Sequence, residues 1–413
     1  MASPVLARSH IRSGYRPQAQ IRTYEFLNYY NVHYQSPEAG SLRLVPQIKQ
    51  VDSTSSYELQ IGVQSPDVPA QRPKVNLTFV LDTSGSMSGT GIAHEKAILK
   101  AVSSALIQGD IVSVVTWNTS SSVLLSGHVF TGSGDTKLVQ IANGLVSDGG
   151  TDLSAGLAKG YQLAAANYAE DRVNRVVLVS DGGANVGVTD ANLIGQQAND
   201  NNQAGIYMVG VGAGSYLDES LMNTVTDAGN GAYVVLDSEE EATRMFAGRF
   251  TEVFDVAARN VQTRMTLPWY FKVSRFFGEQ ISVDPTEVKP QHLAPGDSMV
   301  YSQILSACAP EVVQGSDILG FDTRWTVPGT YEMKTVHAEA TLDQLLAQAK
   351  PELLRGHAII AYAEALKVLQ QDSSLSVAQV FAPVQGALDA ADPSKVDPDL
   401  NEIRDLIAIY PGW

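Results

Sequence analysis

The feature that most constrains the fold is a regular alternation of short apolar runs and amphipathic segments, from Val75 to about residue 256. Runs such as VVLVS and IYMVGV are apolar almost throughout, which is typical of parallel strands buried on both faces of a sheet. The segments between them place their apolar residues on one face of a helix, at 95–108, 153–166, 191–204 and 238–254. We therefore predict an α/β domain over residues 73–256, with a doubly wound, mostly parallel sheet and helices on both faces.

The sequences on both sides of this domain show a different pattern of apolar residues. Alternating or β-branched runs broken by prolines are typical of antiparallel strands, and they occur before and after the α/β domain. These runs lie at 42–48, 57–63, 261–267, 270–275, 298–305 and 330–340. We predict that residues 42–72 and 257–340 together form one discontinuous β-sandwich, into which the α/β domain is inserted.

The two ends of the chain are expected to be largely helical. Residues 1–41 are predicted to be an arm that ends in one short helix. Residues 341–413 are predicted to be a C-terminal helical segment, with helices at 352–370 and 399–409. Pro351 suits the first turn of the longer helix, because a first-turn residue needs no backbone N–H.

Composition and charge exclude several classes of protein. The 413 residues exceed what one hydrophobic core usually serves. A total of 28 Lys and Arg against 44 Asp and Glu gives a net charge of −16, which argues against a nucleic-acid partner. No apolar stretch is long enough to span a bilayer, and the N-terminus lacks the apolar core of a secretory signal. We expect no direct membrane insertion of this chain, and a cytoplasmic location unless a signal was removed.

The most specific motif is Asp82-Thr83-Ser84-Gly85-Ser86, which follows an apolar strand and precedes a helix. Open α/β sheets bind their ligands at the carboxyl ends of strands, and hard divalent cations prefer oxygen ligands. One carboxylate and two hydroxyls are too few to hold such an ion. Two further strand-end segments could supply oxygens, Gly149-Gly150-Thr151-Asp152 and Ser180-Asp181-Gly182-Gly183.

This arrangement resembles the metal-ion-dependent adhesion site of the von Willebrand factor type A (VWA) family. The resemblance implies that Ser84, Ser86 and Thr151 are hydroxyl ligands, and that Asp82 and Asp181 bind the ion directly or through water. The implied cofactor is a divalent cation, Mg²⁺ with Mn²⁺ or Ca²⁺ as alternatives. Four further segments resemble the bacterial YfbK-like subgroup and imply an extracytoplasmic or cell-envelope location: YEFLNYYNVHY, NVGV at 185–188, AGNGAYVVLDS and LLRGHAIIAYAEALKVL.

Several other candidate residues favour a structural role. For Asp152, a role as the N-cap of the helix that starts at Leu153 is favoured over a place in the outer coordination shell of the metal. His94 is expected to be a solvated first-turn residue, and the lone Cys308 a buried small side chain. The aromatic residues Trp117, Trp269 and Tyr270 are expected in the core.

The function that these features favour is metal-dependent binding of a protein partner. An ion held mainly by neutral hydroxyls keeps much of its charge, so its open position is expected to attract a Glu or Asp carboxylate of a partner. One alternative is a metal-dependent hydrolase, although the sequence has no HExxH motif and no recognisable general base near the loops. Another is a subunit of an ATPase-driven assembly. We predict that the protein is not an enzyme.

Overall fold

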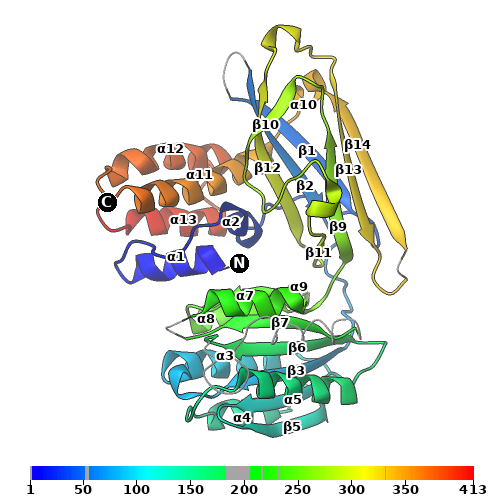
Figure 1. Ribbon diagram of the computed structural model, residues 1–413, viewed down its shortest axis with the longest axis vertical. Coiled ribbons are helices and arrows are strands. Elements are labelled where there is room, and N and C mark those ends of the chain that lie inside the picture. The colour runs from blue at the N-terminus through cyan, green and yellow to red at the C-terminus, as the bar shows by residue number, and fades with distance from the viewer. Residues whose placement is uncertain (1, 52–54, 183–204, 215–216, 230–231, 331) are drawn as a thin grey trace. The chain divides into compact units, whose positions relative to one another are not determined.

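The computed structural model describes residues 2–51, 55–182, 205–214, 217–229, 232–330 and 332–413 (Figure 1). The chain divides into two compact units. The α/β unit comprises residues 70–255, and the flanking unit comprises residues 3–69 together with 256–413. The predicted fold class, an α/β domain inserted in a β-sandwich that both flanks build, is confirmed.

The α/β unit is built on a six-stranded sheet with the order β5-β4-β3-β6-β7-β8. All neighbouring strands are parallel except β5, which pairs antiparallel with β4 at the edge. Every residue of the central strand β3 is buried, as expected for a parallel strand covered on both faces. The strands are β3 (Val75–Asp82), β4 (Ile111–Trp117), β5 (Ser121–Val129), β6 (Val173–Ser180), β7 (Tyr207–Gly212) and β8 (Tyr233–Val235).

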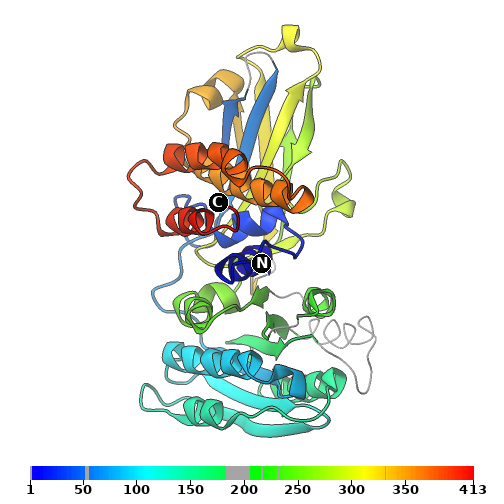
Figure 2. The ribbon, with the colours of Figure 1, turned by 90° about the vertical axis from the view of Figure 1, so that its left-hand side faces the viewer.

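Helices cover both faces of this sheet (Figure 2). Buried residues of α5 and α7 form a hydrophobic cluster with β3, β4, β6 and β7. The predicted helix at 238–254 is broken into α8, a π-helical turn at Arg244–Gly248, and α9, while the predicted helix at 191–204 lies outside the described residues. The described helices are α3 (Thr90–Ala105), α4 (Lys137–Gly144), α5 (Leu153–Ala166), α7 (Glu219–Ala228), α8 (Glu239–Thr243) and α9 (Phe250–Phe254).

The flanking unit contains two four-stranded sheets, β1-β2-β12-β10 and β11-β9-β13-β14. Strand β2 pairs antiparallel with β1 on one side and with β12 on the other, so Gln64 lies opposite both Arg43 and Ser298. Buried side chains of both sheets form one shared core. The strands are β1 (Arg43–Gln50), β2 (Ser56–Gln64), β9 (Ala258–Thr266), β10 (Phe271–Phe276), β11 (Gln291–Leu293), β12 (Ser298–Ala307), β13 (Ile318–Thr326) and β14 (Met333–Thr341).

Helices from both ends of the chain belong to this same unit. The long helix α11 begins at Pro351, as predicted, and packs against α2 and α12. None of the described helices is long and apolar enough to cross a bilayer. The helices are α1 (Ala2–Arg12), α2 (Thr23–Tyr29), α10 (Leu342–Ala347), α11 (Pro351–Gln371), α12 (Val377–Ala391) and α13 (Pro398–Ala408).

The structure corrects the expectation of a single helix in the N-terminal arm, because α1 precedes α2. Val5 and Ile11 of α1 are buried. Arg8 is buried as well, and its guanidinium pairs with Glu402 at 3.3 Å. A partner so distant in sequence stabilises a helix that local periodicity does not predict. Further elements were not predicted individually: α7 in the α/β unit, β11 and β13 in the sandwich, and α10 and α12 in the C-terminal segment.

Two expectations about single side chains were wrong. Cys308 is exposed, because it follows the end of β12 and precedes the turn at Pro310–Val312. Trp269 lies in the turn between β9 and β10 and is 77% exposed. Trp117 and Tyr270 are buried, as predicted.

Candidate metal centre

The first loop of the candidate site follows β3 directly. Asp82 is the last residue of the strand and is fully buried. Its Oδ1 accepts a hydrogen bond of 3.0 Å from the backbone N–H of Ser84, which bends the chain back toward the strand end. The hydroxyl oxygens of Ser84 and Ser86 lie 3.1 Å apart, and Ser84 is buried whereas Ser86 is exposed. Three of the five predicted ligands are therefore joined in one hydrogen-bonded loop.

The second loop contacts the first through its backbone. The carbonyl of Gly149 accepts a hydrogen bond of 3.0 Å from the N–H of Gly85, and Gly149 has a positive φ of 81° that favours glycine. Thr151, two residues on, is buried. Asp152 is the N-cap of α5 and accepts from the N–H of Ala155 at 3.0 Å, so its predicted capping role is confirmed.

The third loop follows β6, whose last residue, Ser180, contacts Asp82, although the sequence analysis assigned Ser180 no role of its own. The hydroxyl of Ser180 donates to Oδ2 of Asp82 at 2.7 Å and accepts from the N–H of Gly182 at 2.9 Å. Asp181 is buried, and its charge acts on Asp82. A Cβ built on Gly214 would lie 3.3 Å from the Cβ of Asp181, so a larger residue there would crowd this carboxylate. The predicted segment 185–188 lies outside the described residues.

Buried carboxyl groups dominate the electrostatics of this site. Burial raises the pKa of Asp82 to about 6, although hydrogen bonds from Ser180 and Ser84 oppose the shift. Glu95 of α3 is also fully buried, and burial together with the charge of Asp82 raises its pKa well above the ordinary value. Neither oxygen of Glu95 has a hydrogen-bond partner of normal geometry within the described chain, although the backbone of Asp82 favours its ionised form.

Glu95 and Ser180 are the neighbours of the site that sequence reasoning missed. A signal existed for Glu95, because it stands among apolar residues on the buried face of α3. His94 beside it is 4% exposed, which corrects the expectation of a solvated histidine. The helix begins at Thr90 rather than near residue 95, so His94 lies in its second turn, and burial lowers its pKa.

The donor set fits a hard divalent cation. It offers carboxylates and hydroxyls and no nitrogen or sulfur, which is the ligand chemistry of Mg²⁺, Mn²⁺ and Ca²⁺. Within the described residues, no group of three or more His, Cys, Asp or Glu could hold a metal by itself, so an ion bound here would have hydroxyl ligands as well. Asp82 and Glu95 form no ion pair with a described basic side chain, and a bound cation would offset that uncompensated burial.

Comparison with known proteins identifies the α/β unit. The family model of the von Willebrand factor type A domain matches residues 76–248. The chain contains a VWA domain. The loops of the candidate site, after β3, before α5 and after β6, all lie inside this VWA domain.

Relatives extend the likeness beyond the VWA domain. An uncharacterized Escherichia coli protein, YfbK, is 26% identical over 265 residues, which cover 60% of this chain and 45% of that protein. An uncharacterized Synechocystis protein, sll0103, is 27% identical over 52% of this chain and 50% of its own length. The chain therefore spans about half the length of these relatives. A solved structure of a von Willebrand factor type A protein from Catenulispora acidiphila shares the fold, with a TM-score of 0.50, 14% identity and coverage of 88% of each chain.

Proposed function

We propose that the VWA domain holds a divalent cation, Mg²⁺ by preference, through Asp82, Ser84, Ser86, Thr151 and Asp181. The observation that carries this proposal is the buried Asp82, whose oxygens accept from Ser84 and Ser180 while burial raises its pKa to about 6. A cation at this strand end would supply the positive charge that the described side chains around Asp82 do not.

The function that we propose for this ion is recognition of a protein partner. VWA domains generally mediate protein–protein interaction or adhesion. Because three of the proposed ligands are neutral hydroxyls, the ion would keep enough positive charge to attract a Glu or Asp carboxylate from the partner. The net charge of −16 would oppose an acidic partner at long range, but salt screens such repulsion beyond about 10 Å. Following the subgroup resemblance, we propose that this contact occurs at the cell envelope.

Metal binding is tested by calorimetry with Mg²⁺ or Mn²⁺ on matched variants. Asp82→Asn is expected to weaken binding at least about tenfold, because it removes a charge from the site but keeps the shape of the side chain. Asp148→Asn is the control, since Asp148 is an exposed carboxylate in the loop that approaches Ser84 and Ser86. Equal affinities for the wild type and Asp82→Asn would contradict the site assignment.

The open coordination position is tested with Mn²⁺ as the bound ion and glutamate as the carboxylate probe. Glutamate is expected to displace water from the bound Mn²⁺ and to lower the water-proton relaxation rate. Thr151→Asp is expected to retain Mn²⁺ but to reduce this effect, because a fixed internal carboxylate competes with the external one. If glutamate displaced water equally from both proteins, the bridging role of the ion would be wrong.

A further inference from the structure

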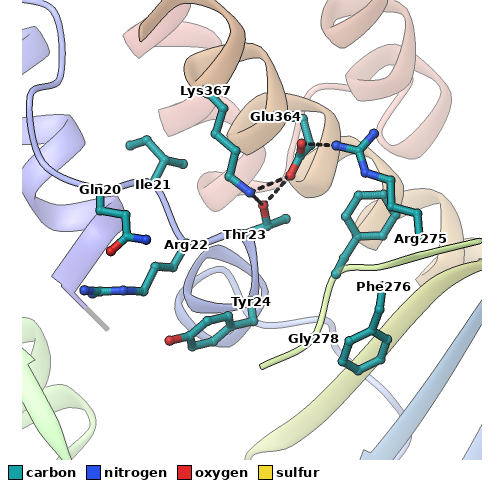
Figure 3. A pocket seen from close by; sticks show the side chains of 11 residues that line it. Gln20, Ile21, Arg22, Thr23, Tyr24, Arg275, Phe276, Gly278, Glu364 and Lys367 are labelled. Carbon is teal, nitrogen blue, oxygen red and sulfur yellow. Dashed lines mark hydrogen bonds and ion pairs between the residues drawn. The ribbon is translucent and has the colours of Figure 1, made fainter. Parts of the chain in front are cut away.

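A small polar pocket lies in the flanking unit, within that unit alone (Figure 3). Its volume is about 240 Å³. Three segments far apart in sequence line it: residues 20–24 before and in α2, residues 275–278 at the end of β10, and Glu364 with Lys367 on α11. No described residue of the VWA domain lines it.

Basic side chains outnumber acidic ones in this lining. Arg22, Arg275 and Lys367 carry positive charge, and Glu364 is the one carboxylate among the lining residues. Arg22 is already paired with Glu25, just outside the lining, at 3.2 Å. Lys367 Nζ lies 2.9 Å from Glu364 and donates to Thr23 Oγ1 at 2.6 Å, while Arg275 pairs with the other oxygen of Glu364. Figure 3 shows Lys367 and Arg275 on either side of this carboxylate. A local excess of positive charge is notable in a chain of net charge −16.

The two cations that Glu364 holds retain hydrogen-bonding capacity. An ammonium group has three donors and a guanidinium five. Lys367 uses two donors, on Thr23 and Glu364, and Arg275 donates one hydrogen bond to Glu364 while its guanidinium lies 4.8 Å from the ring of Phe277. Within the described chain, Lys367 and Arg275 make no further side-chain hydrogen bond. Glu364 thus fixes the positions of two cations without exhausting their N–H groups.

We propose that this pocket binds a phosphate group, either as free phosphate or as part of a small phosphate ester. Donors that approach from different segments suit a tetrahedral oxyanion better than a planar carboxylate, and an anion matches a lining in which Lys367 and Arg275 share one carboxylate. The volume lies below the range of about 300–1,000 Å³ that is usual for drug-sized ligands, so a compact ligand is expected. Glu364 holds Lys367 and Arg275 in place, and its charge also competes with the ligand for these two cations.

Calorimetry on the full chain with inorganic phosphate, and separately with glycerol 3-phosphate, tests the proposal. Arg275→Gln and Lys367→Gln are each expected to weaken phosphate binding about tenfold, the value of one charged hydrogen bond. Lys272→Gln, on the same strand as Arg275 but outside the pocket, removes the same charge and is expected to leave the affinity unchanged. The probe with the higher affinity shows whether the pocket prefers free phosphate or a phosphate ester.

A second variant separates ligand binding from a purely structural ion-pair network. Glu364→Gln keeps the shape of the side chain but removes the competing negative charge, so phosphate affinity is expected to rise. A structural network predicts a loss of thermal stability with no gain in phosphate affinity. The proposal is wrong if phosphate does not bind, if Lys272→Gln weakens binding as much as Arg275→Gln, or if malonate binds where phosphate does not.

Discussion

A buried carboxylate of the flanking unit and those at the candidate metal site of the VWA domain are in opposite electrostatic situations. In the flanking unit, Glu58 lies 2.9 Å from Lys49 Nζ and 2.8 Å from His357 Nδ1. Burial alone would raise its pKa, but these two partners outweigh burial and lower it. In the VWA domain, burial raises the pKa of both Asp82 and Glu95, which lack such partners among the described side chains.

This difference distinguishes carboxylates that stabilise a fold from those that are available to a ligand. A buried carboxylate with a built-in cation adds to the stability of the apoprotein, whereas one without a partner costs stability until a cation arrives. Glu364 of the flanking unit belongs to the first kind, since Thr23, Lys367 and Arg275 lower its pKa against the effect of burial. The comparison predicts opposite responses of the two units to cutting the chain, to pH and to neutral substitutions.

Separating the units is expected to have the largest effect. Residues 70–255 form a contiguous unit with its own core, so this fragment is expected to unfold cooperatively by itself. Residues 256–413 lack β2, which pairs with β12 along its whole length, and this fragment is expected not to fold. Circular dichroism and thermal melts of both fragments measure the outcome. A cooperative melt of fragment 256–413 would contradict the shared sandwich.

The pH dependence of stability is expected to differ in sign between the units. Because the folded-state pKa of Asp82 is about 6, above its unfolded value, its contribution is present below about pH 4 and is lost as the pH rises through 6. In chelator, the wild type is therefore expected to lose up to about 3 kcal/mol relative to Asp82→Asn between pH 4 and 7. Hydrogen exchange of the β3 and β6 amides measures this difference.

The flanking unit provides the internal control for that experiment. The lowered pKa of Glu58 predicts stability that is present at neutral pH and is lost as the pH falls through the folded-state pKa. Protection factors of the β2 amides, which are corrected for the intrinsic exchange rate at each pH, are therefore expected to fall on acidification, in the wild type and in Asp82→Asn alike. Parallel pH profiles of β3 in the two proteins would contradict the raised pKa of Asp82.

A matched pair of neutral substitutions is expected to have the smallest effect. Glu95→Met removes a buried carboxyl group without a good hydrogen-bond partner, and is expected to raise the free energy of unfolding of the apoprotein by about 1–2 kcal/mol. Glu58→Met leaves Lys49 and His357 without their carboxylate and is expected to lower the free energy of unfolding by a similar amount. Urea denaturation with chelator measures both, and changes of the same sign would overturn the comparison.

Much of the fold could be predicted because its signals are local. The apolar runs of β3 and β6 and the capping residue Asp152 determine their own structure within a few residues. Helix α1 could not be predicted in this way, since the partner of its buried Arg8 is Glu402, near the other end of the chain. Trp269 is exposed because it lies in the turn between β9 and β10, and its residue type alone does not reveal this position.

The part of the candidate site that could be predicted is the part whose sequence motifs lie at the ends of strands. The sequence motif identifies Asp82, Ser84 and Ser86, and parallel pairing of β3 with β6 brings Ser180 and Asp181 to the same sheet edge. The role of Ser180 was missed because it depends on its hydroxyl pointing toward Asp82. The spacing of residues in the sequence does not give the direction of a side chain. The metal ligation itself, including the part of Thr151, stays a prediction.

The position of β2 between β1 and β12 has a consequence for the order of folding during synthesis. Residues 56–64 leave the ribosome early, but their partners at 298–306 follow only after the whole VWA domain. At about 5–20 residues per second, β2 waits for roughly 10–50 s with one edge unpaired, while the inserted domain can already fold. During this interval the free edge of β2 can pair with other extended chains, and the rate of elongation through the VWA domain sets how long the edge stays free.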